Sequence, residues 1–146
     1  MTLTVYLSGE IHTDWRDEVI KGAADKGLDI KFTSAVTDHE ASDAAGDTLG
    51  KENVPYWRDH KSAKVNAIRT KTLIENSDMV VVRFGDKYKQ WNAAFDAGYC
   101  AALGKPYITL HAEDIVHPLK EVDAVALAWA TSTDQVVDIL DYVTKK

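Results

Sequence analysis

The chain lacks several features typical of secreted, membrane-bound or nucleic-acid-binding proteins. It has one cysteine, Cys100, so it can form no intrachain disulfide, which fits a reducing compartment. No apolar run approaches the roughly 20 residues that span a bilayer, and no basic segment of the signal-peptide type opens the chain. Acidic residues outnumber basic ones by 23 to 17, which argues against binding polymeric DNA or RNA. We therefore expect a cytoplasmic protein whose ligand is a small molecule, with a nucleoside or nucleotide among the options.

Cofactor and metal fingerprints are also missing. The loop after the first predicted strand, residues 8–16, is neither a P-loop nor a Gly-rich dinucleotide motif, which weakens the case for FMN, NAD or ATP. Ser8 does not sit in a nucleophile elbow, which disfavours a Ser-His-Asp triad. The side chains that might suggest a metal site follow no established metal-binding spacing; they are His12, Asp38, His39, Asp43 and His60. We expect no cofactor and no metal.

Strand-like and helix-like patterns alternate along the chain. The predicted strands are residues 3–7, 28–32, 79–84, 106–110 and 124–130. The predicted helices are residues 14–26, 62–76, 91–104 and 132–143. The segment 124–130 is ambiguous, and we interpret it as a strand because a capping box follows at 132–135. This order predicts a flavodoxin-like three-layer α/β/α fold, with a five-stranded parallel sheet of order 2-1-3-4-5 in a single domain over residues 1–146.

Residues 34–61 show no clear periodicity. The segment is rich in Asp, Gly, Ala and Ser, which predicts a long loop. Loops of this length inside a compact domain commonly act as lids, binding loops or interface elements. Near its end, Tyr56 and Trp57 can stack on a flat ligand, or they can seal a contact between subunits.

The segment Trp91 to Gly104 predicts a helix that is apolar on all sides and therefore buried. Asp96 is the one charged side chain within it, and burying a carboxylate costs several kcal/mol unless it is paired or used. The helix follows a strand, so its first turn lies at the edge of the sheet where α/β proteins bind ligands. Asp96 is therefore a candidate nucleophile or general base. The alternative is a structural carboxylate tied to backbone amides or to Arg69 or Arg83.

Two loops flank the predicted switch point between the first and third strands, residues 8–16 and 84–92. The substrate-binding residues that we predict on them are Gly9, Glu10, His12, Asp14, Arg16, Trp91 and Asn92. Backbone amides near His12, together with Arg16, would suit a carboxylate or phosphate. Alternatively, Arg16 pairs with a neighbouring acid and Asp14 only caps the helix.

The type of chemistry follows from the carboxylate. A carboxylate nucleophile is matched to a glycosyl centre, whose oxocarbenium-like transition state an anion stabilises. Asp86 is the nearest second acid in the sequence and a candidate proton donor to the leaving base, although a loop carboxylate is more often simply solvated. Tyr6 lies on the opposite face of its strand from Leu3 and Leu7. It either orients the nucleophile through its hydroxyl or fills the core.

Several stretches resemble the nucleoside 2-deoxyribosyltransferases: residues 5–10, 76–82 and 95–101. Others resemble the small YtoQ branch of that family: residues 9–16, 84–92 and 117–121. The resemblance implies a flavodoxin-like fold, with Tyr6 at the family's tyrosine position and Asp96 at its catalytic glutamate position. It also implies exchange of the base on a 2-deoxyribonucleoside, or hydrolysis of a deoxynucleotide's N-glycosidic bond. Family subunits pair and complete each other's active sites, which implies a homodimer or higher homo-oligomer.

The chain departs from the family pattern at three places. Asp96 is one methylene shorter than glutamate, which shifts the reacting oxygen. Thr70 stands where the family places an aspartate, and Asn92 begins a stretch that replaces the family's Ser-x-Gly. These departures favour an alternative function, a non-catalytic nucleotide-binding or sensory module. A third hypothesis is a structural interaction protein whose oligomer interface is formed by Tyr56, Trp57 and Trp91.

Overall fold

The computed structural model describes residues 2–146, and five parallel strands form one sheet of order β2-β1-β3-β4-β5. The strands are β1 (Leu3–Gly9), β2 (Ile30–Ser34), β3 (Met79–Arg83), β4 (Tyr107–Leu110) and β5 (Ala128–Ala130). The α-helices are α1 (Trp15–Asp25), α2 (His39–Ala44), α3 (Pro55–Glu75), α4 (Trp91–Leu103), α5 (Lys120–Val125) and α6 (Thr133–Thr144). Two 3-10 helices are η1 (Ala45–Leu49) and η2 (Glu113–Ile115). None of the helices among these residues is long and apolar enough to cross a membrane.

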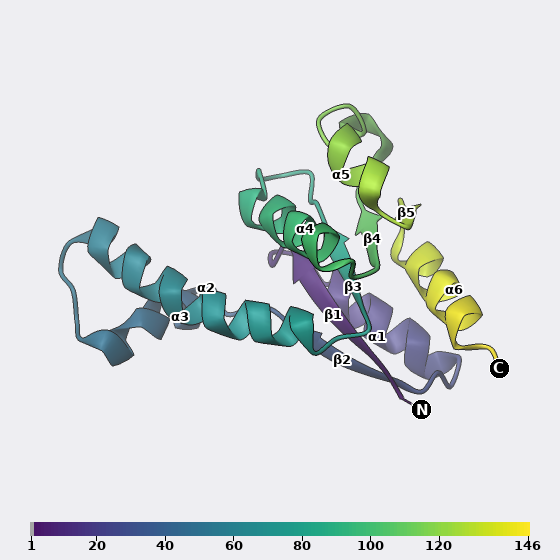
Figure 1. Ribbon diagram of the computed structural model, residues 1–146, viewed down its shortest axis with the longest axis horizontal. Coiled ribbons are helices and arrows are strands. Elements are labelled where there is room, and N and C mark those ends of the chain that lie inside the picture. Colours follow the sequence, from purple (N-terminus) through teal and green to yellow (C-terminus); the bar gives the residue numbers. More distant parts are fainter. Residues whose placement is uncertain (1) are drawn as a thin grey trace.

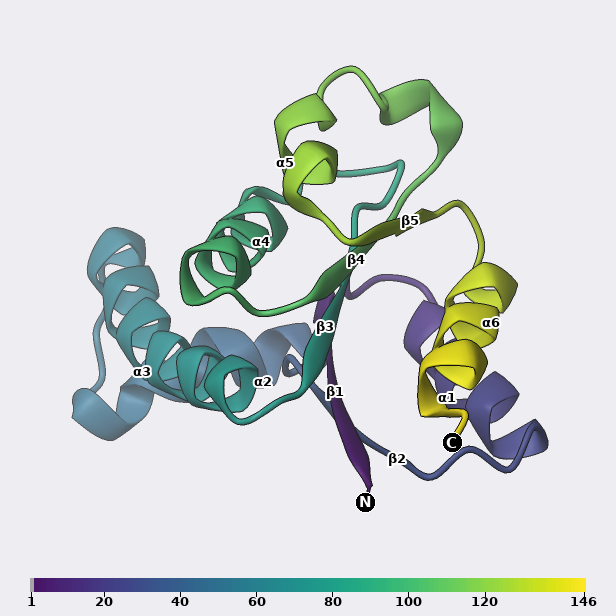
Figure 2. The ribbon, with the colours of Figure 1, turned by 45° about the vertical axis from the view of Figure 1, so that its right-hand side comes forward.

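Helices cover both faces of the sheet, as Figures 1 and 2 show, with α1 and α6 on one side and α3, α4 and α5 on the other. Along β1, Val5 and Leu7 pack in the core beneath α1 and α6, whereas Tyr6 packs in the core beneath α3 and α4. Every residue of Val80 to Val82 in β3 is buried, as expected of a central parallel strand. The predicted three-layer fold and strand order are confirmed.

The expectation of a loop over residues 34–61 is wrong. That segment contains α2 and η1, and α3 begins at Pro55 rather than at the predicted Ser62. Proline is favoured at a helix's first position because its missing N–H would have no partner there. The Ser62 hydroxyl accepts a hydrogen bond from the Gly46 amide (3.1 Å) and donates one to the Asp43 carbonyl (2.5 Å). These contacts hold α2 and η1 against the part of α3 that extends beyond the sheet (Figure 1).

The predicted strand over 124–130 is also too long. Only Ala128–Ala130 is a strand, whereas residues 124 and 125 end α5 and residues 126 and 127 connect the helix to the strand. The buried Asp123 carboxylate explains why the helix continues: it accepts hydrogen bonds from the Thr109 hydroxyl (2.7 Å) and contacts His111 Nε2 at 2.8 Å. These contacts fasten α5 to the end of β4, a tertiary constraint that local periodicity does not reveal.

Gly9 sets the geometry at the end of β1. Its φ of +106° is a conformation that other residues rarely adopt, and a Cβ there would lie 2.1 Å from the Arg83 carbonyl oxygen. The next residue, Glu10, donates its amide to that same carbonyl (3.1 Å). The chain therefore leaves β1 by crossing tightly over the end of β3, which brings the following loop to the switch point between these two strands.

Gly9→Ala should reduce the free energy of unfolding by at least about 2 kcal/mol, because it adds both backbone strain and a clash with β3. Gly98→Ala is the matched control: a Cβ at this helical position meets nothing within 4 Å. It should leave stability unchanged or raise it by about 0.5–1 kcal/mol. Urea unfolding measures both variants, and equal stability of the two would contradict this account of the β1–β3 contact.

Candidate active site

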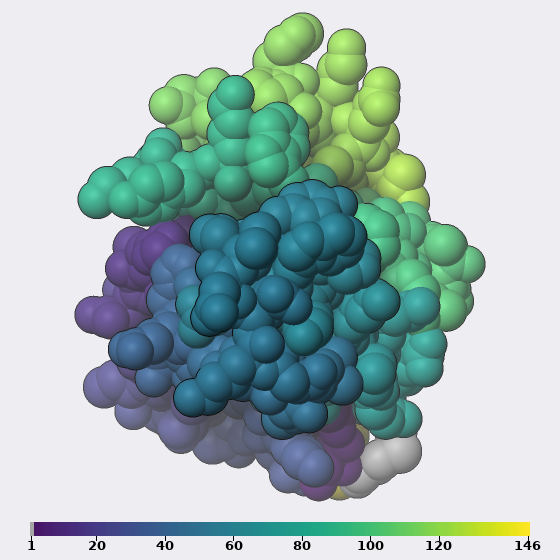
Figure 3. All heavy atoms as spheres, turned by 90° about the vertical axis from the view of Figure 1, so that its left-hand side faces the viewer, coloured from purple at the N-terminus to yellow at the C-terminus, as the bar shows by residue number. Residues whose placement is uncertain are grey.

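A cavity of about 640 Å3 opens between α3 and α4, at the carboxyl end of β1. In Figure 3 the segment leading into α4 overhangs the α2–α3 segments, with a crease between them. Six of the residues predicted from the sequence line this cavity: Tyr6, Gly9, Glu10, Trp91, Asn92 and Asp96. The cavity therefore lies at the switch point where α/β folds bind ligands.

Asp96 lies on the cavity wall, where it is partly buried. Burial raises the pKa of its carboxyl, and a hydrogen bond from the Ser8 hydroxyl, 2.6 Å from Oδ2, partly offsets this by lowering it. Asp96 comes five residues after the first residue of α4, beyond the turn in which a helix dipole acts strongly. Its protonation is therefore governed by burial and by Ser8.

Tyr6 is fully buried, yet its hydroxyl has no hydrogen-bond partner among the described residues. Of the two roles that the sequence left open, the hydrogen bond to Asp96 is not formed, whereas the Tyr6 side chain packs in the core. Burial and then the nearby Asp96 carboxylate raise the pKa of Tyr6, and the positive charge of Arg69 lowers it. Tyr6, Thr70 and Asp96 all line the cavity, where the carboxylate lies close enough to affect the tyrosine. A buried, unpartnered hydroxyl on a cavity wall is a ready donor or acceptor for a ligand.

Ser8 is the site residue that sequence reasoning missed. Side chains alternate along a strand, so Ser8 lies on the same face of β1 as Tyr6, towards α4. The alternation of side chains along the strand could have predicted the direction in which Ser8 points. It could not have predicted which residue the Ser8 hydroxyl contacts. The partner became visible only once α4 was packed over the end of β1, because Asp96 is 88 residues away in the sequence.

The other residues predicted on the first loop lie elsewhere. His12, Asp14 and Arg16 line a separate hollow of about 400 Å3 next to α1. The Arg16 guanidinium donates to the backbone carbonyls of Leu7 (3.1 Å) and Glu10, and burial lowers its pKa. Its donors are thus directed to the protein's own backbone, where they hold the loop against α1.

The remaining loop residues have distinct positions. Glu10 faces the cavity, but its carboxylate accepts hydrogen bonds from the His12 amide and the Thr13 hydroxyl (2.6 Å). Asp14 is the N-cap residue of α1, although its side chain makes no capping hydrogen bond. Asp86 is exposed on the loop before α4 and lines neither hollow.

The prediction that α4 is buried on all sides is wrong. Ala93 and Cys100 face the sheet, but Trp91 is 73% exposed and Phe95 is 72% exposed. Apolar composition alone cannot show which side a neighbouring element covers, and here only the sheet-facing side is covered. The N-cap residue is Gln90, so Asn92 is the second helical residue and not the cap.

Other chemistry has little support in this geometry. Cys100 is fully buried, and burial raises the pKa of its thiol to about 12, so it stays protonated and unreactive. Within residues 2–146, no three His, Cys, Asp or Glu side chains are grouped so that they could hold a metal ion. The chemically distinctive group on the cavity wall is the Asp96 carboxylate.

Comparisons with known proteins show a family that the chain matches in sequence and solved structures that share its fold. Residues 6–144 match the family described as "Nucleoside 2-deoxyribosyltransferase YtoQ". The chain is 38% identical over 144 residues to the "Uncharacterized protein YtoQ" of Bacillus subtilis (strain 168), covering 98% of this chain and 97% of the relative.

Two solved structures share the fold at low sequence identity. A conserved protein from Enterococcus faecalis V583 has a TM-score of 0.64 at 11% identity, covering 98% of this chain and 99% of that one. A 2-deoxyribosyltransferase from Bacillus psychrosaccharolyticus has a TM-score of 0.53 at 15% identity, covering 92% and 90% of the two chains.

Asp96→Asn should raise the free energy of unfolding at pH 7 by about 1 kcal/mol, or a few degrees in Tm, because the ionised carboxylate is only partly solvated. The native-state pKa lies above the unfolded one, so the carboxylate begins to lower stability as pH rises above about 4, and the penalty is complete above the native pKa. The gain should therefore shrink as pH is lowered towards 4. Melting curves across this range measure it, and a less stable variant at pH 7 would show that the anion is structural.

Proposed function

The chain belongs to the nucleoside 2-deoxyribosyltransferase YtoQ family, and from that premise we propose that it cleaves or transfers the N-glycosidic bond of a (deoxy)nucleoside or nucleotide. The observation that carries this proposal is the Asp96 carboxylate, partly sheltered from water on a cavity wall and oriented by Ser8. A carboxylate in this setting suits attack on a sugar carbon that develops positive charge.

The proposed reaction has two steps. In the first, an Asp96 oxygen forms an ester bond with C1′ while the C1′–N bond breaks, and the bonding electrons leave with the base, which takes up a proton. In the second, a nitrogen of another base or the oxygen of water attacks C1′, loses a proton and releases the carboxylate. Because Asp96 is partly buried from water, its charge attracts the oxocarbenium-like transition state more strongly than it would in solution.

The residues around Asp96 have proposed supporting roles. The Ser8 hydroxyl fixes one carboxylate oxygen, which leaves the other for attack. The unpartnered Tyr6 hydroxyl hydrogen-bonds to the sugar or to the reacting carboxylate when substrate binds. Asp86 remains the proposed proton donor to the leaving base, and since it is exposed outside the cavity wall, this role requires the loop before α4 to close over the substrate.

A second candidate function is a nucleotide-binding or sensory module without turnover. It is favoured by the side chains at two family positions, where Asp96 is shorter than glutamate and Thr70 brings a neutral hydroxyl in place of a carboxylate. Both changes alter the reacting group and its surroundings, while the cavity and the Tyr6 hydroxyl are retained. This candidate predicts binding without release of free base.

Asp96→Ala should abolish release of free base from deoxynucleosides and deoxynucleotides, with a loss of at least about 1000-fold, because it removes the nucleophile. Ser8→Ala should lower activity much less than Asp96→Ala and move its acidic limb to higher pH, because the carboxylate remains but the hydrogen bond that orients it and lowers its pKa is gone. Chromatography of released base measures both. Activity unchanged in Asp96→Ala would eliminate the nucleophile assignment, and binding without release in the unaltered protein would favour the second candidate.

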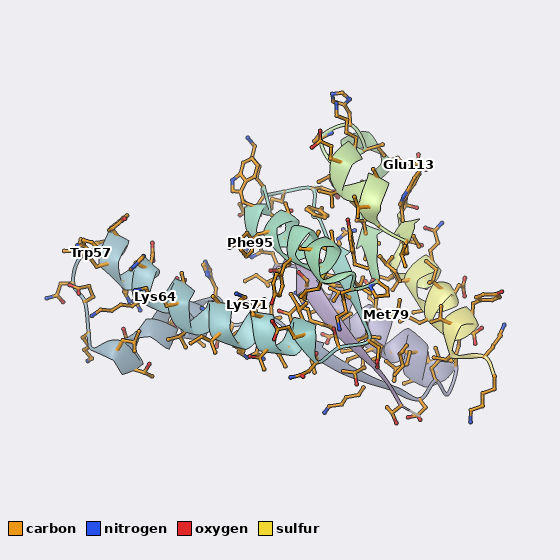
Figure 4. All side chains as sticks on the ribbon, in the orientation of Figure 1. Trp57, Lys64, Lys71, Met79, Phe95 and Glu113 are labelled. Carbon is orange, nitrogen blue, oxygen red and sulfur yellow. The ribbon has the colours of Figure 1, made fainter. Side chains whose placement is uncertain are left out.

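We also propose that the protein assembles as a homo-oligomer through its exposed apolar side chains. On α4 these include Trp91 and Phe95, and on the extended α3 they include Trp57 and Ile68, which is 71% exposed. Figure 4 shows Trp57 at the outer end of α3. Apolar surface gathered on two neighbouring helices is characteristic of contacts between protein chains.

Trp57→Glu should shift the protein towards smaller species, because a charge at a buried contact is costly to desolvate. Tyr142→Glu is the matched control, since Tyr142 is equally a large exposed aromatic, 76% exposed, but lies on α6 against the other face of the sheet. Light scattering coupled to size-exclusion chromatography gives the mass of each variant. Identical masses for both variants, or a monomeric unaltered protein, would contradict assembly through this surface.

A further inference from the structure

Residues 86–89, in the loop before α4, are fixed at their base but not along their length. At the base, the Gln90 side-chain oxygen accepts a hydrogen bond from the Gly85 amide (2.9 Å). Gly85 also packs directly on Glu10, because a Cβ at Gly85 would lie 2.6 Å from Glu10 Cγ. Within residues 2–146, the segment 86–89 forms no hydrogen bond or salt bridge with another segment. It is therefore anchored at both ends and free of polar contacts between them.

A ring contact holds the tip of this segment. The Tyr88 ring packs against the His12 ring of the loop after β1, with 4.9 Å between the ring centres and an interplanar angle of 55°. His39, the first residue of α2, lies edge-on to the same His12 ring, with 6.2 Å between the centres. The backbone of His12 is fixed in turn, because its amide donates to the Glu10 carboxylate. Three segments that are distant in the sequence therefore meet at His12.

This ring contact lies at the rim of the 640 Å3 cavity. Ile11 and Lys89 are the chain neighbours of His12 and Tyr88, and both line the cavity, whereas His12 and Tyr88 do not. Residues on either side of His39 in the chain also line it. In Figure 3 the overhanging segment that leads into α4 faces the purple end of β1 across one end of the crease. The Tyr88–His12 contact therefore closes one end of the cavity's opening.

We infer that residues 86–89 are a flap that controls access to the cavity, with the stacked rings of Tyr88 and His12 as its latch. Tyr88 is 51% exposed and His12 is also exposed. A contact between exposed rings is weak, so the latch opens and closes again in the ordinary motion of surface loops. When it opens, the flap turns about its base at Gly85 and Gln90 and the opening of the cavity widens.

The flap also bears on the proposed reaction. Asp86 is one of its residues, and with the latch closed it is exposed and lines neither hollow. Release of Tyr88 frees the flap to move Asp86 relative to the cavity, so the latch decides when the proposed proton donor reaches the leaving base. This consequence alone rests on the glycosyl transfer proposed above, whereas control of access applies to any ligand of the cavity.

The test measures how fast a reagent reaches a thiol placed on the cavity wall. Asp96→Cys supplies that thiol, and the native Cys100 does not interfere, because it is fully buried and burial raises the pKa of its thiol to about 12. In this background, Tyr88→Ala and His12→Ala should each speed alkylation by iodoacetamide at least about threefold. The double variant should react no faster than either, because both substitutions remove the same contact. Fluorescein maleimide, a larger reagent, should be accelerated more.

Tyr88→Phe keeps the ring and should leave the alkylation rate unchanged. Tyr142→Ala is the matched control, because it removes an exposed tyrosine from α6, on the other side of the sheet. Alkylation of Cys100 in a Tyr88→Ala protein that keeps Asp96 reports general loosening and should stay as slow as in the unaltered protein. Equal rates for Tyr88→Ala and Tyr142→Ala, a fast Tyr88→Phe, multiplied effects in the double variant, or faster Cys100 alkylation would each overturn the latch. Base release is not measured, so the outcome is independent of the proposed reaction.

Discussion

The hydrogen bond between Ser8 and Asp96 is the contact on which the rest of the site depends. It joins the end of β1 to α4 across 88 residues of sequence, and it decides where the carboxylate points. It forms only because β1 pairs with β3, Gly9 lets the chain turn away over Arg83, and α4 then packs back over the end of the sheet. The position of one oxygen atom is thus a consequence of the strand order.

Two opposing effects act on the pKa of the Asp96 carboxyl group. Burial favours its neutral form, whereas the serine hydroxyl favours the anion. On the same wall lie a tyrosine hydroxyl without a partner and basic side chains without acids. The partly buried carboxylate and the buried tyrosine hydroxyl are both less satisfied here than they would be in water. Unsatisfied groups that share one cavity are typical of a site arranged for a ligand rather than for stability.

The sequence predicted the architecture better than the site. Alternation along β1 and the continuous apolar run of β3 predicted the sheet and its order, because these patterns are local. The helices at 39–44 and 55–61 escaped detection, since α2 is short and depends on the distant Ser62. Likewise, the predicted strand order placed the loop that carries Arg16 near the cavity, but the guanidinium of Arg16 donates to backbone carbonyls that only the folded loop presents. Side-chain direction and long-range partners are tertiary properties, and a pattern of residue types does not contain them.

The contact between Gly9 and Arg83 limits which positions of this fold can accept a different side chain. The turn there is built from backbone alone, with no room for any side chain against Arg83. Positions 70, 86 and 96, by contrast, present their side chains without shaping the sheet, so exchanges among acids, amides and hydroxyls at these positions leave the scaffold intact. The framework therefore tolerates a change of chemistry at the cavity wall, whereas it does not tolerate a side chain at Gly9.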